Sequence, residues 1–381
     1  MSFPCAYNDI RCKLLFSYKK AEDTYVICSI KGDAQYYCKK KFVDIILDVF
    51  KYFDGTHSVD EIKDIIAKKY PCYKVDKVID KLADSKFIIG NNNSNLSNEL
   101  ELNSLNLVKL DISFISKINK HIIDFFYYLF SFSFVVAVFI FIFLLFKGEI
   151  TFSNYIQYAN RNSYGKEFLI VLIAGIPSMV LHEISHILTA QHYGYSPKHL
   201  GFSLHFYFIP MYYVITPGMY LLDRSKRMHY HLSGVMANFV LFAVFNLIAY
   251  FTKDSIYYVL AFSNLQVVIF NLMPFNLTDG YFVMCLIFKK INLRLQFIEL
   301  LSFRKNLKNQ SFSIKIYALI AFIYMVILSF NLSFWLKGFI SEMFGFEITH
   351  KYLFDTVVAA MSLVFFIVSI NIRARKKPKN H

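Results

Sequence analysis

Long apolar blocks occupy the chain from about residue 120 onward, and they constrain its fold more than any other feature. A helix that crosses a bilayer needs ~20 consecutive apolar residues. Hydrophobic residues make up 56% of the 381 residues and charged residues only 18%, which is little charge for a soluble protein. Because backbone groups in lipid must bond to one another, such blocks predict α-helices. We therefore expect a mostly α, polytopic membrane protein.

Six of these blocks have the length of a membrane span. The first carries one charged residue, Asp124, close to its start. The second is apolar up to Leu181 and then contains His182, Glu183 and His186. We predict about six transmembrane helices, with the lipid bilayer as their partner, over residues 123–146, 168–190, 232–251, 256–272, 314–336 and 352–370.

Basic residues between and after the blocks indicate how the chain crosses the membrane. Of the net charge of +14, residues 1–120 carry +3 and the remainder carries +11. Lys and Arg concentrate in cytoplasmic loops, and here they gather at 224–227, 289–290, 304–305 and 373–379. This pattern predicts a multi-pass protein of the cell membrane with both termini in the cytoplasm. No nucleic-acid partner is expected, because such a protein would carry its basic excess on the soluble domain.

Residues 1–90 are expected to form a small soluble α+β domain that is winged-helix-like. Segments 13–18 and 24–30 are rich in β-branched and aromatic residues, which predicts strands. Ser58 and Glu61 have the spacing of a capping box at the start of a helix. We predict helices over 42–53, 58–70 and 74–85.

The remaining organisation follows from changes in composition. Residues 91–98 are almost all Asn and Ser, too polar to pack, so they predict a flexible linker. We expect a linker and juxtamembrane segment over 91–120, a membrane domain over 121–372 and a basic cytoplasmic tail over 373–381.

His182, Glu183 and His186 form an HExxH motif inside the second apolar block. Positions i and i+4 lie one above the other on a helix, so two imidazoles can bind one metal ion. Glu183 stands beside the first ligand, where a carboxylate can activate water. Ionisable residues inside a membrane span are costly and mark functional sites by default. The alternative is a buried polar pair that bonds a neighbouring helix.

Asp279 is the candidate for a third ligand, which two histidines alone do not supply to a catalytic zinc. Pro274 breaks the preceding helix, and Asn276 and Gly280 favour irregular backbone around the carboxylate. Irregular backbone at membrane depth is tolerated only where it lines protein or a wet cavity. The alternative is that Asp279 only caps the helix that follows it.

These motifs carry a family resemblance. An HExxH on a hydrophobic helix, followed by the pattern Asn-x-x-Pro-x-x-x-x-Asp-Gly over 271–280, resembles the site-2 protease family of intramembrane zinc proteases. Residues 233–238 read Ser-Gly-Val-Met-Ala-Asn, which is similar to the family's Ala-Gly-Pro-x-x-Asn. The run 271–281 is most similar to the branch called peptide zinc metalloproteases. The resemblance covers about residues 165–290.

The resemblance implies a role for each matching residue. His182, His186 and Asp279 match the ligands of Zn²⁺, and Glu183 matches the catalytic Glu. Asn271 matches an Asn that holds substrate backbone in an extended form, and Asn238 is likewise expected to bind substrate.

Three positions depart from the family's pattern: Ser233 replaces Ala, Val235 replaces Pro, and Thr278 stands where Leu is usual. None is an expected ligand, so the departures bear on substrate fit rather than on zinc. The implied activity is that of a zinc metalloendopeptidase. Its expected substrate is a membrane-spanning protein or a ribosomally synthesised precursor peptide.

The N-terminal domain resembles the PqqD-like domains that bind leader peptides. The resemblance rests on the residues 45–62, including Phe53-Asp54-Gly55 and the Ser58 cap, and then on 78–82. A DNA-binding winged helix has the same periodicity, but the low charge of the domain argues against DNA. Structural docking against the membrane domain is the third reading.

The segment Gly194–Gly218 is aromatic and β-prone, which is unusual for a cytoplasmic loop beside a membrane helix. The resembling family has a β-rich loop in this place. An open strand edge there could pair with an unwound substrate.

Two alternatives to a peptidase remain open from the residues alone. His182 and His186 also read as HxxxH, which is found in membrane di-iron oxygenases, but the 229–231 segment does not supply the further histidine cluster that such a site needs. An exporter or immunity protein with an inactive zinc fold is the non-enzymatic alternative. The complete ligand set together with Glu183 argues against it.

Overall fold

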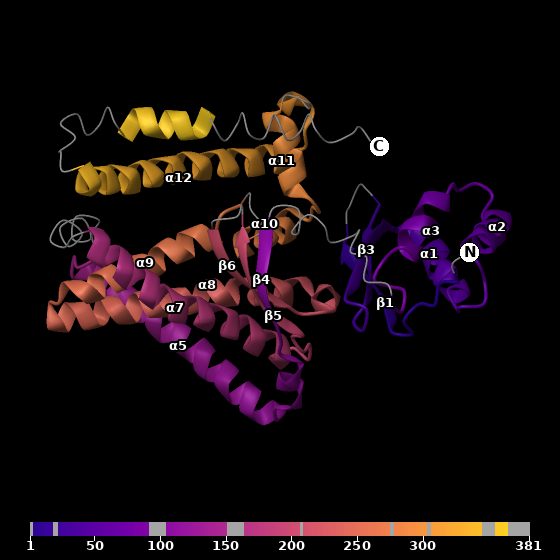
Figure 1. The fold of residues 1–381 in the computed structure, drawn as a ribbon, viewed down its shortest axis with the longest axis horizontal. Helices are drawn as coiled ribbons and strands as arrows, with labels where there is room; N and C mark the ends of the chain where they lie inside the picture. The colour runs from indigo at the N-terminus through magenta and orange to yellow at the C-terminus, as the bar shows by residue number, and fades with distance from the viewer. Residues whose placement is uncertain are drawn as a thin grey trace. The chain divides into compact units, whose positions relative to one another are not determined.

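The computed structural model describes residues 3–17, 22–90, 104–150, 164–205, 209–274, 278–302, 306–344 and 355–364. Most of these residues are helical, and the strands form two small antiparallel sheets (Figure 1). The chain divides into two compact units. One comprises Met1–Tyr127 and His186–Tyr230, and the other comprises Tyr128–Ser185 and His231–His381.

The N-terminal part of the first unit is a three-stranded sheet followed by three helices. The strands lie in the order β1-β2-β3 (Ile10–Phe16, Thr24–Ser29, Ala34–Lys39). The helices are α1 (Lys40–Tyr52), α2 (Val59–Lys69) and α3 (Asp76–Ala83), and their apolar faces share one core with Ile27 of β2. The predicted strands and helices are present. Strand β3 was not predicted, because no turn residue separates it from α1. The winged-helix expectation is not confirmed.

Two polar arrangements hold the helices of this domain. At the start of α2, Ser58 Oγ accepts from the Glu61 amide, and the Glu61 carboxylate accepts from the Ser58 amide at 2.7 Å. The capping box predicted from the sequence is therefore confirmed. Asp48 of α1 is almost fully buried and accepts hydrogen bonds from Lys51, Lys69 and Tyr70 at 2.8, 2.6 and 2.5 Å. These bonds hold the pKa of Asp48 well below its ordinary value.

The same sheet contacts the first turn of helix α8 (Arg224–Thr252) and the residues just before it. Lys13 Nζ donates to the carbonyl of Leu221 and to the carboxylate of Asp223, both at 2.7 Å. The guanidinium of Arg227 is buried, lies 5.9 Å from the ring centroid of Phe16 and donates to the carbonyl of Leu15. A buried cation is tolerated where a ring face and a carbonyl replace its water. The domain thus docks on the chain between residues 221 and 227.

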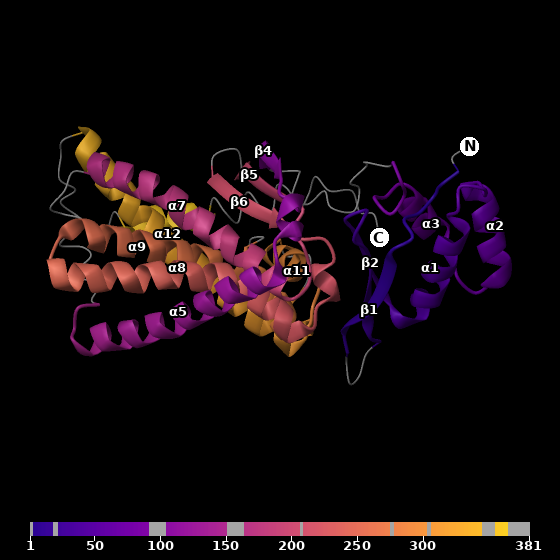
Figure 2. The same ribbon diagram turned by 90° about the horizontal axis from the view of Figure 1, so that it is seen from below.

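A second sheet follows the linker region. Strands β4 (Ser104–Asp111), β5 (His199–His205) and β6 (Ile209–Ile215) pair antiparallel in the order β4-β5-β6. Figure 2 shows the three strands side by side. The β-rich character expected of Gly194–Gly218 is confirmed by β5 and β6. Strand β4 differs from the linker expected over residues 91–120, because its residues pair with β5. Residues 91–98 lie outside the described part of the chain.

The remaining helices are long and apolar. They are α5 (Lys120–Phe146), α7 (Tyr164–His192), α8 (Arg224–Thr252), α9 (Ser255–Asn271), α10 (Asp279–Phe288), α11 (Leu293–Leu301) and α12 (Phe312–Phe344). Helices α8 and α9 lie side by side in both views and share a core around Phe242 and Tyr258 (Figures 1 and 2). Helix α10 and helix α11 were not predicted as separate elements.

Three helices in the described residues are long and apolar enough to cross a membrane: Lys120–Phe146, Arg224–Thr252 and Phe312–Phe330. They indicate a membrane protein. Of the six predicted spans, these three coincide with helices of sufficient length and apolarity, whereas α9 has only 17 residues. Of the predicted span 352–370, only Asp355–Val364 is described, and the basic positions 304–305 and 373–379 lie outside the described residues.

The Asp48 arrangement predicts a local loss of stability. Replacing Asp48 by Asn removes a buried charge that three donors bind. The free energy of local unfolding of α1 and α2 should therefore fall by about 1–3 kcal/mol. Because the pKa is lowered in the folded state, the stabilisation is present above about pH 4 and is lost as the pH falls below that value. Hydrogen exchange of the α1 and α2 amides in the full-length protein measures the effect. Asp64→Asn, an exposed acid on α2, is the matched control and should leave exchange unchanged.

Candidate metal centre

Helix α7 carries the HExxH motif in its second half. His182, Glu183 and His186 are all buried, with relative exposures of 6%, 7% and 5%. One turn of helix separates the two histidines, so their rings lie on the same face. Three buried ionisable side chains within five residues of an otherwise apolar helix are costly unless they bind something.

Asp279 is the first residue of α10, after a break in the helical chain. Helix α9 ends at Asn271, as Pro274 predicted, and the Pro274 carbonyl accepts from the hydroxyl of Tyr317 at 2.7 Å. Thr278 occupies the N-cap position, and its hydroxyl donates to the carbonyl of Met273. Asp279 is therefore not the N-cap residue. Residues 275–277, including Asn276, lie outside the described residues.

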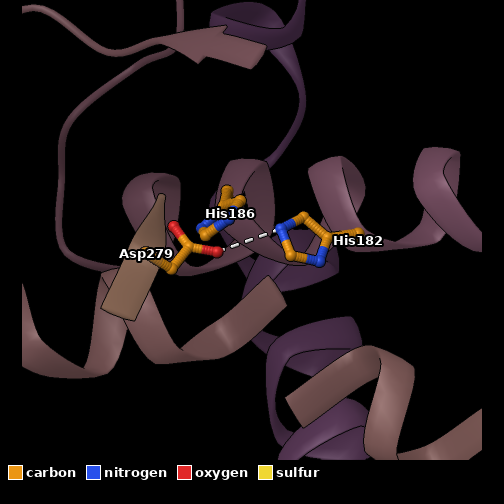
Figure 3. A group of neighbouring side chains, drawn as sticks. All are labelled: His182, His186 and Asp279. Carbon is orange, nitrogen blue, oxygen red and sulfur yellow. Dashed lines mark ion pairs between the residues drawn. The ribbon is translucent and has the colours of Figure 1, made fainter. Parts of the chain in front are cut away.

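The structure brings the three predicted ligands together (Figure 3). One donor atom from each of His182, His186 and Asp279 lies within 4.8 Å of the other two. Nε2 of His182 is 3.0 Å from Oδ2 of Asp279. Two donors on one tetrahedral ion with bonds of ~2.1 Å lie ~3.4 Å apart. The separation is therefore close to that of two ligands of one ion.

Hydrogen bonds on the far side of each imidazole fix which nitrogen faces the centre. Nδ1 of His182 bonds to Oδ1 of Asn238 at 2.7 Å, and Nδ1 of His186 bonds to the carbonyl of Tyr230 at 2.8 Å. Both acceptors require a proton on Nδ1, so in the neutral form of each ring Nε2 keeps its lone pair for a metal ion. Metal-binding histidines are usually held in this way. Two imidazole nitrogens and one carboxylate are the donor set that zinc prefers, and these residues fit it.

The amide of Asn238 is itself fixed. Its nitrogen donates to the carbonyl of Ser178 and to Oδ1 of Asn264, at 3.4 and 3.3 Å. The oxygen must therefore face His182. Asn238 has no exposed surface, and it positions His182, a role that its sequence motif does not predict. Its expected role in substrate binding stays a prediction.

Gly234 explains a second part of the motif at 233–238. A Cβ added at this glycine would collide with the imidazole ring of His182. Helix α8 can therefore approach the metal centre only without a side chain at this position. Gly280 is similar, because a Cβ there would collide with the backbone of Leu272.

Other residues have less definite places. Asn271 is half-buried at the end of α9, and its expected contact with substrate stays a prediction. His231 was missed as a site residue. Its Nδ1 lies 3.9 Å from Oδ1 of Asp279. The available signal was its position on α8, three residues before Gly234 and seven before Asn238, which places all three on one face of a helix.

A comparison with curated proteins finds a relative from Bacillus subtilis (strain 168), named "Putative peptide zinc metalloprotease protein YydH". It is 35% identical over 120 residues, which is 31% of this chain and 48% of the relative. The match therefore spans about half of that protein's length. It supports a zinc metalloprotease family. No family model matches the chain, and no solved structure matches it.

The bond between Asn238 and His182 predicts the effect of removing it. Asn238→Leu keeps the branched shape of the side chain but leaves the Nδ1 proton of His182 without its acceptor, so zinc affinity should fall about 10- to 100-fold. Competition with a chromophoric chelator measures the dissociation constant. Asn246→Leu changes a buried Asn two turns further along α8, whose amide bonds to Phe242 of the same helix, and should keep wild-type affinity. Equal losses in both variants would contradict the specific role of Asn238.

Proposed function

We propose that the protein is a zinc metalloendopeptidase of the site-2 type, which hydrolyses peptide bonds at membrane depth. The observation that carries the proposal is the convergence of His182, His186 and Asp279, with Glu183 on the same helix as the two histidines. The relative named as a peptide zinc metalloprotease supports the same class of reaction.

Glu183 is the proposed general base. When bound, zinc polarises the peptide carbonyl and lowers the pKa of water. Glu183 takes a proton from the water molecule while the oxygen of that water bonds to the carbonyl carbon of the peptide. Glu183 then delivers the proton to the leaving nitrogen as the C–N bond breaks. Asn238 and the Tyr230 carbonyl keep the two imidazoles in the required tautomer throughout.

The alternatives are less well supported. A di-iron oxygenase needs a second set of metal-binding residues, whereas the described residues contain one group able to hold an ion, His182, His186 and Asp279. An inactive exporter or immunity protein would not need Glu183 beside a complete donor set. Both alternatives therefore leave a feature of the centre unexplained.

The proposed substrate is a membrane-spanning protein or a ribosomally made precursor peptide, captured by the PqqD-like domain over residues 1–90. We place the protein in the cell membrane with both termini in the cytoplasm, so the domain and the β4-β5-β6 sheet would meet the same substrate. In the described residues β6 has a strand partner on one side only. Its other edge is the proposed place where an extended substrate strand pairs.

Replacing Glu183 by Gln tests the mechanism. The amide keeps the shape of the side chain but cannot accept the proton, so cleavage should fall about 10²- to 10⁴-fold while zinc content stays unchanged. The assay uses a library of transmembrane peptides in liposomes with the purified protein, and mass spectrometry identifies the products. Glu299→Gln on α11 is the control. Cleavage by Glu183→Gln at the wild-type rate would rule out the proposed base.

Deleting residues 1–90 tests the role of the N-terminal domain. If the domain captures substrate, kcat/KM for the native precursor should fall while kcat and zinc content stay unchanged, because tethering raises the local substrate concentration. Lys13→Ala is the matched control, since it keeps the domain but loses the contacts to Leu221 and Asp223. A loss shared by both variants would assign the effect to docking. Equal rates with and without the domain would contradict substrate capture.

A further inference from the structure

His231 lies on the face of α8 that is turned toward the metal centre. It precedes Gly234 by one helical turn and Asn238 by two. Gly234 leaves room for the ring of His182, and Asn238 accepts its hydrogen bond. The three residues therefore present successive turns of one helix to the same group of ligands.

The carboxylate of Asp279 faces two different rings with its two oxygens. Oδ2 is 3.0 Å from Nε2 of His182, and Oδ1 is 3.9 Å from Nδ1 of His231. Side-chain exposures are 7% for His231 and 13% for Asp279. At 3.9 Å the Nδ1 and Oδ1 atoms are beyond hydrogen-bond distance but within ion-pair distance, so the charge of Asp279 acts on the His231 ring, and little water screens it.

The ring of His231 is held in this orientation by α10 itself. It stacks on Phe282, with ring centroids 4.8 Å apart and planes 15° apart. Phe282 follows Asp279 by three residues, so both side chains lie on the same face of α10. One turn of α10 thus supplies both the carboxylate and the surface that positions its neighbour.

Each of the three expected ligands then has a partner from α8. Asn238 binds His182, the Tyr230 carbonyl binds His186, and His231 faces Asp279. Partners of this kind orient metal ligands, and their loss weakens metal affinity about 10- to 100-fold. A carboxylate with Oδ1 directed to His231 offers Oδ2 to the ion.

We infer that His231 is a positioning residue for Asp279, which holds the carboxylate so that Oδ2 faces the two histidines. The inference rests on the proposed function insofar as the ion is zinc. It is a role for a side chain of α8, distinct from the ligands and from the catalytic Glu183.

The test compares two substitutions of His231 in the full-length protein. His231→Phe keeps a ring to stack on Phe282 but has no donor, whereas His231→Gln keeps an N–H donor of similar reach. We expect the zinc dissociation constant to rise about 10- to 100-fold for Phe and to return to within about threefold of wild type for Gln. The visible spectrum of the Co²⁺-loaded protein should shift for Phe and be restored for Gln.

His229→Phe is the control, because it makes the same change on α8 at a ring that bonds to the hydroxyl of Tyr193 and to none of the expected ligands. If His231→Phe does not fold, His231→Ala takes its place. The inference would be overturned if the folded variant, His231→Phe or His231→Ala, bound zinc as tightly as His231→Gln. Failure of the proposed function gives a different result: the wild-type protein would then not bind zinc, or Glu183→Gln would still cleave.

Discussion

The metal centre depends on two hydrogen bonds that lie outside it. Nδ1 of His182 is bonded to Asn238, and Nδ1 of His186 is bonded to the Tyr230 carbonyl. Without them each ring could rotate or carry its proton on the nitrogen that faces the centre. In an apolar interior, an N–H on the wrong ring nitrogen has no water molecule to accept its hydrogen bond. The two bonds therefore contribute to how tightly this part of α7 can bind a cation.

Those bonds explain two residues of α8, Gly234 and Asn238. Gly234 lets the helix approach the ring of His182. The amide oxygen of Asn238 then faces His182, because its amide nitrogen donates to Ser178 and Asn264 on the other side. The break before α10 has a similar cause. Asp279 reaches His182 only because α9 ends at Asn271 and a new helix begins at Asp279. If α9 continued without a break, its axis would fix the direction of the Asp279 side chain.

Local patterns in the sequence predicted the parts of the site that depend on spacing. The helix break before Pro274 and the Ser58 capping box are confirmed, because each is set by residues within one or two turns of one another. The two histidines of the HExxH motif lie on one helix face beside Asp279, as their spacing predicts, and their role as metal ligands stays a prediction. Of the six predicted spans, three coincide with described helices that are long and apolar enough to cross a membrane. Strands β3 and β4 were missed, and β4 is stabilised by pairing with β5, nearly a hundred residues later.

Contacts between distant segments could not be predicted in the same way. Nothing near Asp279 in the sequence points to His231, and nothing near Lys13 points to Asp223. Such pairs are visible only when the helices are placed in space. The role of Asn238 shows the same limit: its motif was recognised, but its bond to His182 depends on the approach of α8 to α7.

Helix α8 begins where the N-terminal sheet docks and continues as the helix that orients the ligands. Arg227, buried against Phe16 and Leu15, stands three residues before Tyr230, whose carbonyl binds His186. One helical turn is stiff, because its backbone hydrogen bonds fix the residues relative to one another. The contact that holds the N-terminal domain and the contact that orients His186 therefore share the same turn of helix. If Arg227 is displaced, either that turn of helix distorts or Tyr230 moves with it.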